Sequence, residues 1–221
     1  WIRHFRRWDV AEAVMVGRVR KASMYEPLAV LRRLPDLRAL KLWYRNLRGD
    51  KRNDALLGAL ADELESSGVT LIDSTKYIPD HLATAGNLTR RRPSRGQSAD
   101  IEFGHPIVRE MGGLDIGQSI AVRDREVIAV EAIEGTDAMI KRAGELCPTG
   151  GWTLIKVAKP DQDMRFDVPT IGLNTIKNLA AAGGTCLAVE AGRVILLDKP
   201  DLLAAADDAG IAIIGIESHD D

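Results

Sequence analysis

The sequence predicts an α/β fold of two domains, the second of which holds a mixed sheet. Three observations support this prediction. Short apolar runs alternate with stretches of helical periodicity, 45% of the 221 residues are hydrophobic, and the periodicity vanishes between the two parts. We therefore expect an N-terminal domain at residues 1–83, a linker at 84–98 and a C-terminal domain at 99–221.

The N-terminal domain begins with elements that are typical of an α/β layer. Residues 13–19 form an apolar run that ends near Gly17, as in a buried parallel strand. Residues 53–67 predict an amphipathic helix, because their leucines form one stripe and Gly68 closes the segment. Residues 69–72 predict the strand that follows this helix.

The linker and the C-terminal domain follow. Residues 84–98 are rich in Thr, Gly, Asn, Pro, Ser and Arg, and their arginines either are solvated or contact an anionic lipid surface or a substrate phosphate. A helix then spans about 99–110, where Pro106 predicts a kink or a late start. The remaining elements are strands 119–122 and 127–130 as a hairpin, a helix that runs to residue 145, strand 153–159, helix 170–182, strands 186–189 and 194–197, helix 199–209 and strand 211–216.

The charge distribution also separates the two parts of the chain. Up to Gln97 there are 19 Lys and Arg against 11 Asp and Glu, a net charge of +8, whereas the rest has 11 against 21, a net charge of −10. A basic part joined to an acidic part suggests that the basic part faces an anion. Scattered, solvated arginines account for the excess equally well.

Missing motifs remove several functional classes. The chain has no phosphate-binding loop of the Gly-x-x-x-x-Gly-Lys type, no Gly-x-Gly-x-x-Gly and no Gly-x-Ser-x-Gly, so kinase, dinucleotide-binding and serine-hydrolase functions lose their main support. The histidines are dispersed, and Cys147 and Cys186 are isolated, as reduced structural thiols are. No apolar run is long enough for a membrane span and no signal peptide opens the chain, so we expect a soluble, cytoplasmic protein.

The most informative stretch is residues 162–172, Gln-Asp-Met-Arg-Phe-Asp-Val-Pro-Thr-Ile-Gly. Charged and bulky residues alternate in it, so we expect a short extended segment with Asp163, Arg165 and Asp167 on one face. Thr170 would then cap a helix, and the N-terminus of that helix would also suit a phosphate.

A second charged patch lies at residues 131–142, and Lys156 and Lys159 follow on a strand between the two patches. Carboxylates and cations this close in sequence suggest a phosphate or metal-phosphate site. Mg²⁺ suits such a site, because it takes one or two carboxylates together with phosphate oxygens. Structural alternatives stay open, since Glu131 could be a strand residue that faces solvent and Asp137 could simply cap its helix.

These segments resemble the LpxI family, the UDP-2,3-diacylglucosamine pyrophosphatases of lipid A biosynthesis. The resemblance covers essentially all of residues 99–218 and is weaker in the first part; its blocks are 114–119, 129–139 with Arg142, 156–160, 162–172 and 190–192. It implies an N-terminal Rossmann-like domain whose first strand and Gly-rich loop would precede Trp1. We therefore expect that domain to be truncated at its start.

The resemblance also implies a reaction and its partners. The reaction is hydrolysis of the pyrophosphate bond of a lipid-bearing UDP-sugar to UMP and 2,3-diacylglucosamine 1-phosphate, known as lipid X. The enzyme would be a homodimer that depends on a divalent metal such as Mg²⁺. Apart from the resemblance, we expect peripheral contact with the cytoplasmic face of the inner membrane and no nucleic-acid partner. Two alternatives stay open, a non-catalytic module that binds a nucleotide sugar or lipid phosphate, and a pyrophosphatase for a soluble nucleotide sugar.

The resemblance places the family's essential aspartate at Asp167, and the neighbouring charges suggest further site residues. The expected catalytic residues are Asp167, Arg165 and Lys159. The expected substrate-binding residues are Gln118, Thr136, Arg142, Lys156, Gln162 and Thr170. The expected metal ligands are Asp167, Asp163, Glu134 and Asp137. Asp167 would either orient or deprotonate the attacking water or bind the metal.

Overall fold

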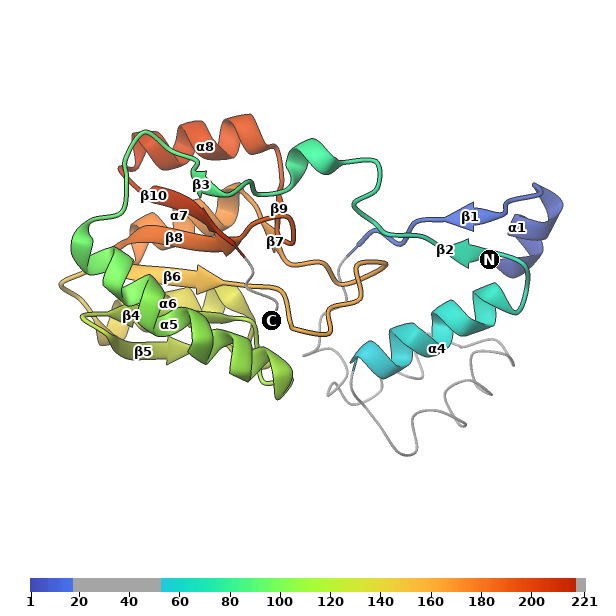
Figure 1. Ribbon diagram of the computed structural model, residues 1–221, viewed down its shortest axis with the longest axis horizontal. Coiled ribbons are helices and arrows are strands. Elements are labelled where there is room, and N and C mark those ends of the chain that lie inside the picture. Colours follow the sequence, from blue (N-terminus) through green and yellow to red (C-terminus); the bar gives the residue numbers. More distant parts are fainter. Residues whose placement is uncertain (18–52, 218–221) are drawn as a thin grey trace. The chain divides into compact units, whose positions relative to one another are not determined.

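The computed structural model of the protein describes residues 1–17 and 53–217, which fall into two compact units (Figure 1). Unit 1 comprises the described residues from Trp1 to Tyr77 together with Asp163–Asp167, and unit 2 comprises Ile78–Gln162 and the described residues from Val168 onward. Both units combine helices and strands, and the sheet of unit 2 is mixed, so the predicted two-domain α/β class is confirmed.

The described part of unit 1 holds two helices, a short parallel strand pair and a small core. Its elements are α1 (Ile2–Arg7), β1 (Glu12–Ala13), α4 (Asn53–Glu65) and β2 (Thr70–Leu71), with β1 and β2 paired in parallel. Two leucines of the predicted stripe, Leu57 and Leu64 of α4, are buried with Leu71 of β2, whereas Leu60 is exposed. The helix and the strand predicted at 53–67 and 69–72 are therefore confirmed. The strand predicted at 13–19 is wrong in its described part, because only Ala13 lies in a strand and residues 14–17 are irregular, while residues 18 and 19 lie outside the described residues.

Unit 2 is built on a six-stranded sheet with the order β3-β10-β8-β6-β4-β5. The strands are β3 (Gly86–Asn87), β4 (Ser119–Arg123), β5 (Glu126–Val130), β6 (Trp152–Lys156), β8 (Gly184–Glu190) and β10 (Ala212–Ile216). The three central strands β10, β8 and β6 run parallel, whereas β3, β4 and β5 pair antiparallel to their neighbours. The predicted hairpin of β4 and β5 is confirmed.

Helices cover both faces of this sheet. The helix α5 (Arg95–Gly113) packs on one face, where Ile120, Val122 and Ile155 form a core with Val108. The helices α6 (Thr136–Leu146), α7 (Leu173–Ala181) and α8 (Lys199–Asp208), labelled in Figure 1, contribute buried residues to the core of the other face. Successive residues of β4 and β6 alternate between the two cores, as the pleat of a strand requires. Within the described part of the chain, no helix is long and apolar enough to cross a membrane.

Residues 84–98 contribute to unit 2 through a strand and a helix start. Gly86–Asn87 form β3, which pairs with β10. Ser94 caps α5 through a reciprocal capping box with Gln97, which starts the helix four residues earlier than expected. Pro106 lies inside α5 and does not delay its start.

Three local predictions in the charged segments are wrong. Residues 163–167 form a turn rather than an extended segment, because the backbone N–H of Phe166 bonds to the carbonyl of Asp163. Thr170 lies in the short strand β7 (Thr170–Ile171), which pairs with β9 (Ile195–Leu196), and its hydroxyl donates to the carbonyl of Val168 instead of capping a helix. Asp137 does not cap α6 either, since Gly135 occupies the N-cap position without a side-chain bond.

Candidate active site

A polar cluster lies where the parallel strands β6 and β8 of unit 2 end. Lys156 is the last residue of β6 and Glu190 is the last residue of β8, so both lie at the same edge of the sheet. The helix α6 begins at Thr136, and Thr136 contacts Lys156 at this edge. Ligands of α/β proteins usually bind at the carboxyl ends of parallel strands.

On the α6 face of the sheet, the side chains inside β4 and β6 are apolar, whereas those at this edge are polar. Ser119 pairs with Lys156 across the two strands, and the N–H of Glu131 bonds to the carbonyl of Ser119 at 2.8 Å. The Lys156 ammonium donates to Thr136 Oγ1 at 2.9 Å, and the Thr136 hydroxyl donates to Glu131 Oε1 at 3.0 Å. All four side chains are buried. Glu131 therefore does not face solvent, contrary to the alternative that its position after a strand suggested.

On the α5 face, Glu190 holds the loop that carries Lys159. Its carboxylate is fully buried, and Oε2 accepts the backbone N–H of Ala158 at 2.8 Å. Its other oxygen accepts from Arg109 Nη1 at 3.3 Å and lies 4.0 Å from Arg193 Nη1. Arg193 in turn donates to the carbonyl of Lys159 at 3.2 Å. This network fixes the backbone on both sides of Ala158.

Lys159 lies beyond the end of β6, so the strand predicted at 153–159 ends earlier than expected, and Lys159 forms its own ion pair beside this network. Its ammonium lies 2.6 Å from Asp115 Oδ1, and both side chains are mostly buried. The loop that follows Asp115 packs closely on the backbone of Glu131, because a Cβ at Gly117 would overlap the carbonyl oxygen of Glu131. Gln118 continues this loop, and its carbonyl accepts the N–H of Val157 at 3.1 Å. The expected site residues Gln118, Thr136, Lys156 and Lys159 are thus brought to one edge of unit 2.

The other expected residues of unit 2 stabilise its local structure. Arg142 forms a 2.6 Å ion pair with Glu134 and donates to the carbonyl of Val130 at 2.6 Å, which ties the start of α6 to β5. Asp137 Oδ1 accepts from Asn178 of α7 at 3.2 Å. The backbone N–H of Gln162, the last residue of the first segment of unit 2, donates to the carbonyl of Lys159 at 3.0 Å.

The remaining three expected residues, Asp163, Arg165 and Asp167, belong to unit 1. Arg165 donates to both oxygens of Asp163 at 2.7–3.0 Å, and this guanidinium holds the pKa of the Asp163 carboxyl below its usual value. Because the folded pKa is the lower one, the pair stabilises the fold above pH about 4 and this contribution is lost as the pH falls further. Asp167 is exposed and adopts the left-handed conformation with φ 58°.

The four carboxylates expected as metal ligands do not form one ligand set. Asp163 is engaged by Arg165, Glu134 by Arg142 and Asp137 by Asn178. Among residues 1–17 and 53–217, no three His, Cys, Asp or Glu side chains converge in a way that could hold a metal ion.

Several residues of the cluster were missed in the sequence. They are Ser119, Glu131, Asp115, Arg109, Glu190 and Arg193. Glu131 and Glu190 carried a usable signal, since each is an acidic residue directly after an apolar run that reads as a strand. Strand register, which the sequence does not reveal, decides whether such a residue is buried beside a lysine or solvated.

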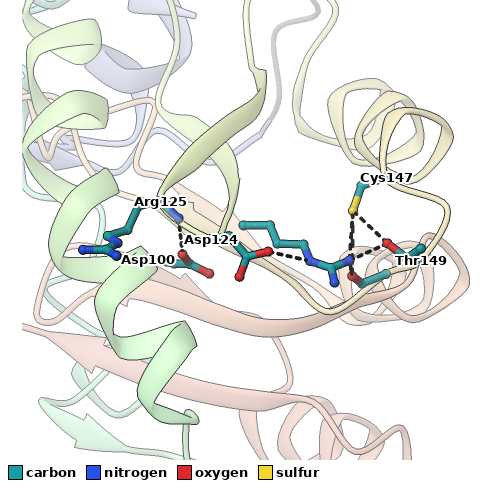
Figure 2. A network of polar contacts seen from close by, with 7 residues as sticks. Asp100, Asp124, Arg125, Cys147 and Thr149 are labelled. Carbon is teal, nitrogen blue, oxygen red and sulfur yellow. Dashed lines mark hydrogen bonds and ion pairs between the residues drawn. The ribbon is translucent and has the colours of Figure 1, made fainter.

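A different polar network lies at the opposite end of the strands (Figure 2). Arg123, the last residue of β4, donates to Cys147 Sγ at 3.4 Å, to Thr149 Oγ1 at 2.5 Å and to the carbonyl of Gly150. In the turn between β4 and β5, the N–H of Arg125 bonds to Asp100 Oδ1 at 2.7 Å. Burial opposes ionisation of the Cys147 thiol, but the bonds from Arg123 and Thr149 outweigh it and lower the pKa of Cys147.

We expect iodoacetamide to alkylate Cys147 in the native protein while Cys186 stays unmodified. The thiolate is the reactive form, and burial raises the pKa of Cys186 to about 12. Mass spectrometry of timed samples between pH 6 and 9 measures both rates. In Arg123→Gln the labelling curve of Cys147 should move to higher pH, because the guanidinium that favours the thiolate is gone. Equal labelling of both cysteines would contradict this assignment.

Comparison with known proteins adds two findings. The model of the LpxI N-terminal domain matches residues 1–81, and that of the LpxI C-terminal domain matches residues 84–214. A protein named UDP-2,3-diacylglucosamine pyrophosphatase LpxI, from Caulobacter vibrioides, is 36% identical over 195 residues, which cover 85% of this chain and 70% of that protein.

Proposed function

Since this chain belongs to the LpxI family, we propose that it hydrolyses the pyrophosphate bond of UDP-2,3-diacylglucosamine, giving UMP and 2,3-diacylglucosamine 1-phosphate in lipid A biosynthesis. The observation that carries the proposal is the pair of buried lysines, Lys156 and Lys159, at the carboxyl end of β6. Lysines are seldom buried unless they are paired, and these two lie at the edge of the sheet where ligands of α/β proteins usually bind.

The chemistry of a pyrophosphate explains why two such cations would be needed. Its non-bridging oxygens are negatively charged and repel an incoming nucleophile, so hydrolysis requires cations placed on those oxygens and a positioned water. In our proposal Lys156 and Lys159 neutralise the oxygens. Glu190 and Asp115 hold the lysine-bearing loop in place through the 2.8 Å bond to Ala158 and the 2.6 Å pair with Lys159.

Asp167 is the residue that we propose for handling the attacking water. A carboxylate accepts hydrogen bonds and can orient a water or take its proton. The turn before Asp167 is held in unit 1 by two contacts. Phe166 is buried in the core of unit 1, and Arg165 donates a hydrogen bond to Asp163. Such anchoring keeps a catalytic carboxylate in a defined position.

The test uses the chain with UDP-2,3-diacylglucosamine in mixed micelles and follows UMP by chromatography. UDP-N-acetylglucosamine serves as the matched substrate without acyl chains. Release of UMP only from the acylated substrate would support the proposal, and absence of UMP would refute it. Parallel reactions with Mg²⁺ and with EDTA test the proposed dependence on a divalent metal. We also propose that the protein forms a homodimer and contacts the membrane that holds the substrate, and sedimentation and liposome flotation test these two expectations.

A further inference from the structure

The bonds between Lys156, Thr136 and Glu131 can run in one direction only. An ammonium group has donors and no acceptor, so the Thr136 oxygen must accept from Lys156. An ionised carboxylate has acceptors only, so the Thr136 hydroxyl hydrogen must point to Glu131 Oε1. Glu131 therefore fixes the rotation of the Thr136 hydroxyl, and this hydroxyl then fixes the position of the Lys156 ammonium.

A purely structural role does not explain why a glutamate is buried at position 131. Its second oxygen, Oε2, is buried and has no hydrogen-bond partner in the part of the chain that the structure describes. Ser119 Oγ, at the same edge, is likewise buried without a partner among the described residues. Half-satisfied buried carboxylates cost stability, and apolar residues of similar size often replace buried ions without loss. Proteins carry such costs mainly at functional sites.

We propose that Glu131 is a positioning residue, which acts through Thr136 to hold the Lys156 ammonium against a phosphate of the substrate. The inference rests on the proposed function, because it names what keeps one of the two phosphate-binding lysines in place. A lysine side chain has a flexible four-carbon stem, so an unheld ammonium would occupy several positions. The chain Glu131–Thr136–Lys156 removes that freedom before the substrate arrives.

The test is a double-mutant cycle with Glu131→Ala and Thr136→Val. Each single variant should lower kcat for UMP release, and affinity for UMP by calorimetry, about tenfold, the effect of a hydrogen bond to a charged group. The double variant should lose no more kcat and UMP affinity than the more impaired of the two single variants, because both changes break the same chain of hydrogen bonds. Thr136→Ser keeps the hydroxyl and should restore most of the activity.

Thr153→Val is the matched control. Thr153 is buried on the same strand, β6, but its side chain lies on the α5 face, and the same change there should leave kcat and UMP affinity unaltered. Thermal midpoints of all variants separate a folding defect from a positioning defect.

The outcomes distinguish this inference from the proposed function. If the wild type binds UMP but releases none from the lipid substrate, hydrolysis fails and the UMP affinities alone decide the role of Glu131. If the wild type hydrolyses the substrate and the two single variants keep kcat and UMP affinity, or if their losses multiply in the double variant, the positioning role is overturned. A wild type that neither hydrolyses nor binds UMP counts against both.

Discussion

Replacing Asp167 by asparagine should lower the rate of UMP release about a thousandfold, within the range that a positioned acid or base contributes to catalysis. Asparagine has nearly the same size and tolerates the left-handed backbone of residue 167, whose φ is 58°. The substitution therefore removes the charge without distorting the turn. Alanine would add backbone strain at this φ, so its effect would combine that strain with the loss of the carboxylate. Initial rates of UMP release at saturating substrate measure the change.

Two matched variants make the Asp167 result specific. Asp9 in unit 1 is also exposed and also has a positive φ, of 52°, so Asp9→Asn repeats the same chemical change at a site without a proposed role. Its rate should equal that of the wild type. Asp167→Gly relaxes the backbone and removes the carboxylate, and it should be as inactive as the asparagine variant. An Asp167→Asn protein with more than a tenth of the wild-type rate would exclude Asp167 from the chemical step.

Replacing Glu190 by alanine should destabilise unit 2 by about 3–5 kcal/mol, the usual cost of removing one partner from a buried ion pair. Glu190 is fully buried, and its loss leaves Arg109 and Arg193 without their shared carboxylate and the N–H of Ala158 without its acceptor. For a chain of this size the thermal midpoint should fall by roughly 10 °C. Scanning calorimetry or circular dichroism measures it.

The matched change for Glu190 is Glu145→Ala. Glu145 pairs with Lys141 at 3.9 Å on the surface of α6, where both side chains are largely exposed. Exposed pairs of this kind contribute about 0.3–0.5 kcal/mol, so its midpoint should stay close to that of the wild type. A Glu190→Ala protein that melts together with Glu145→Ala would show that the buried network does not hold the 157–160 loop.

The regular elements could be predicted because their signals are local. The leucine stripe of α4 and the two short apolar runs of the β4–β5 hairpin depend on residues near one another in sequence. The turn at 163–167 could not be predicted in this way. Its alternating pattern fits a strand, but Phe166 is buried among residues of α4 and β2, and this distant contact together with the Arg165–Asp163 bond selects a turn.

The residues of the candidate site also differ in whether a local sequence signal could reveal them. Lys156 and Thr136 could be placed because they stand at a strand end and a helix start. Asp167 depended on the family resemblance, and no pattern of charge distinguished it from Asp163. Glu131 could be noticed as an acidic residue after an apolar run, but its burial could not be predicted, because that burial follows from its place beside Ser119 in the sheet. Glu134 and Asp137 looked like metal ligands, yet each bonds to one neighbouring side chain.

The return of the chain to unit 1 at Asp163–Asp167 has a consequence for how the protein is made. Synthesis proceeds from the N-terminus, and N-terminal domains generally fold first. Here Phe166, a member of the unit 1 core, is translated only after β3, α5, β4, β5, α6 and β6 of unit 2. A nascent chain that ends before residue 166 therefore carries an incomplete first core, so unit 1 reaches its final packing late in translation.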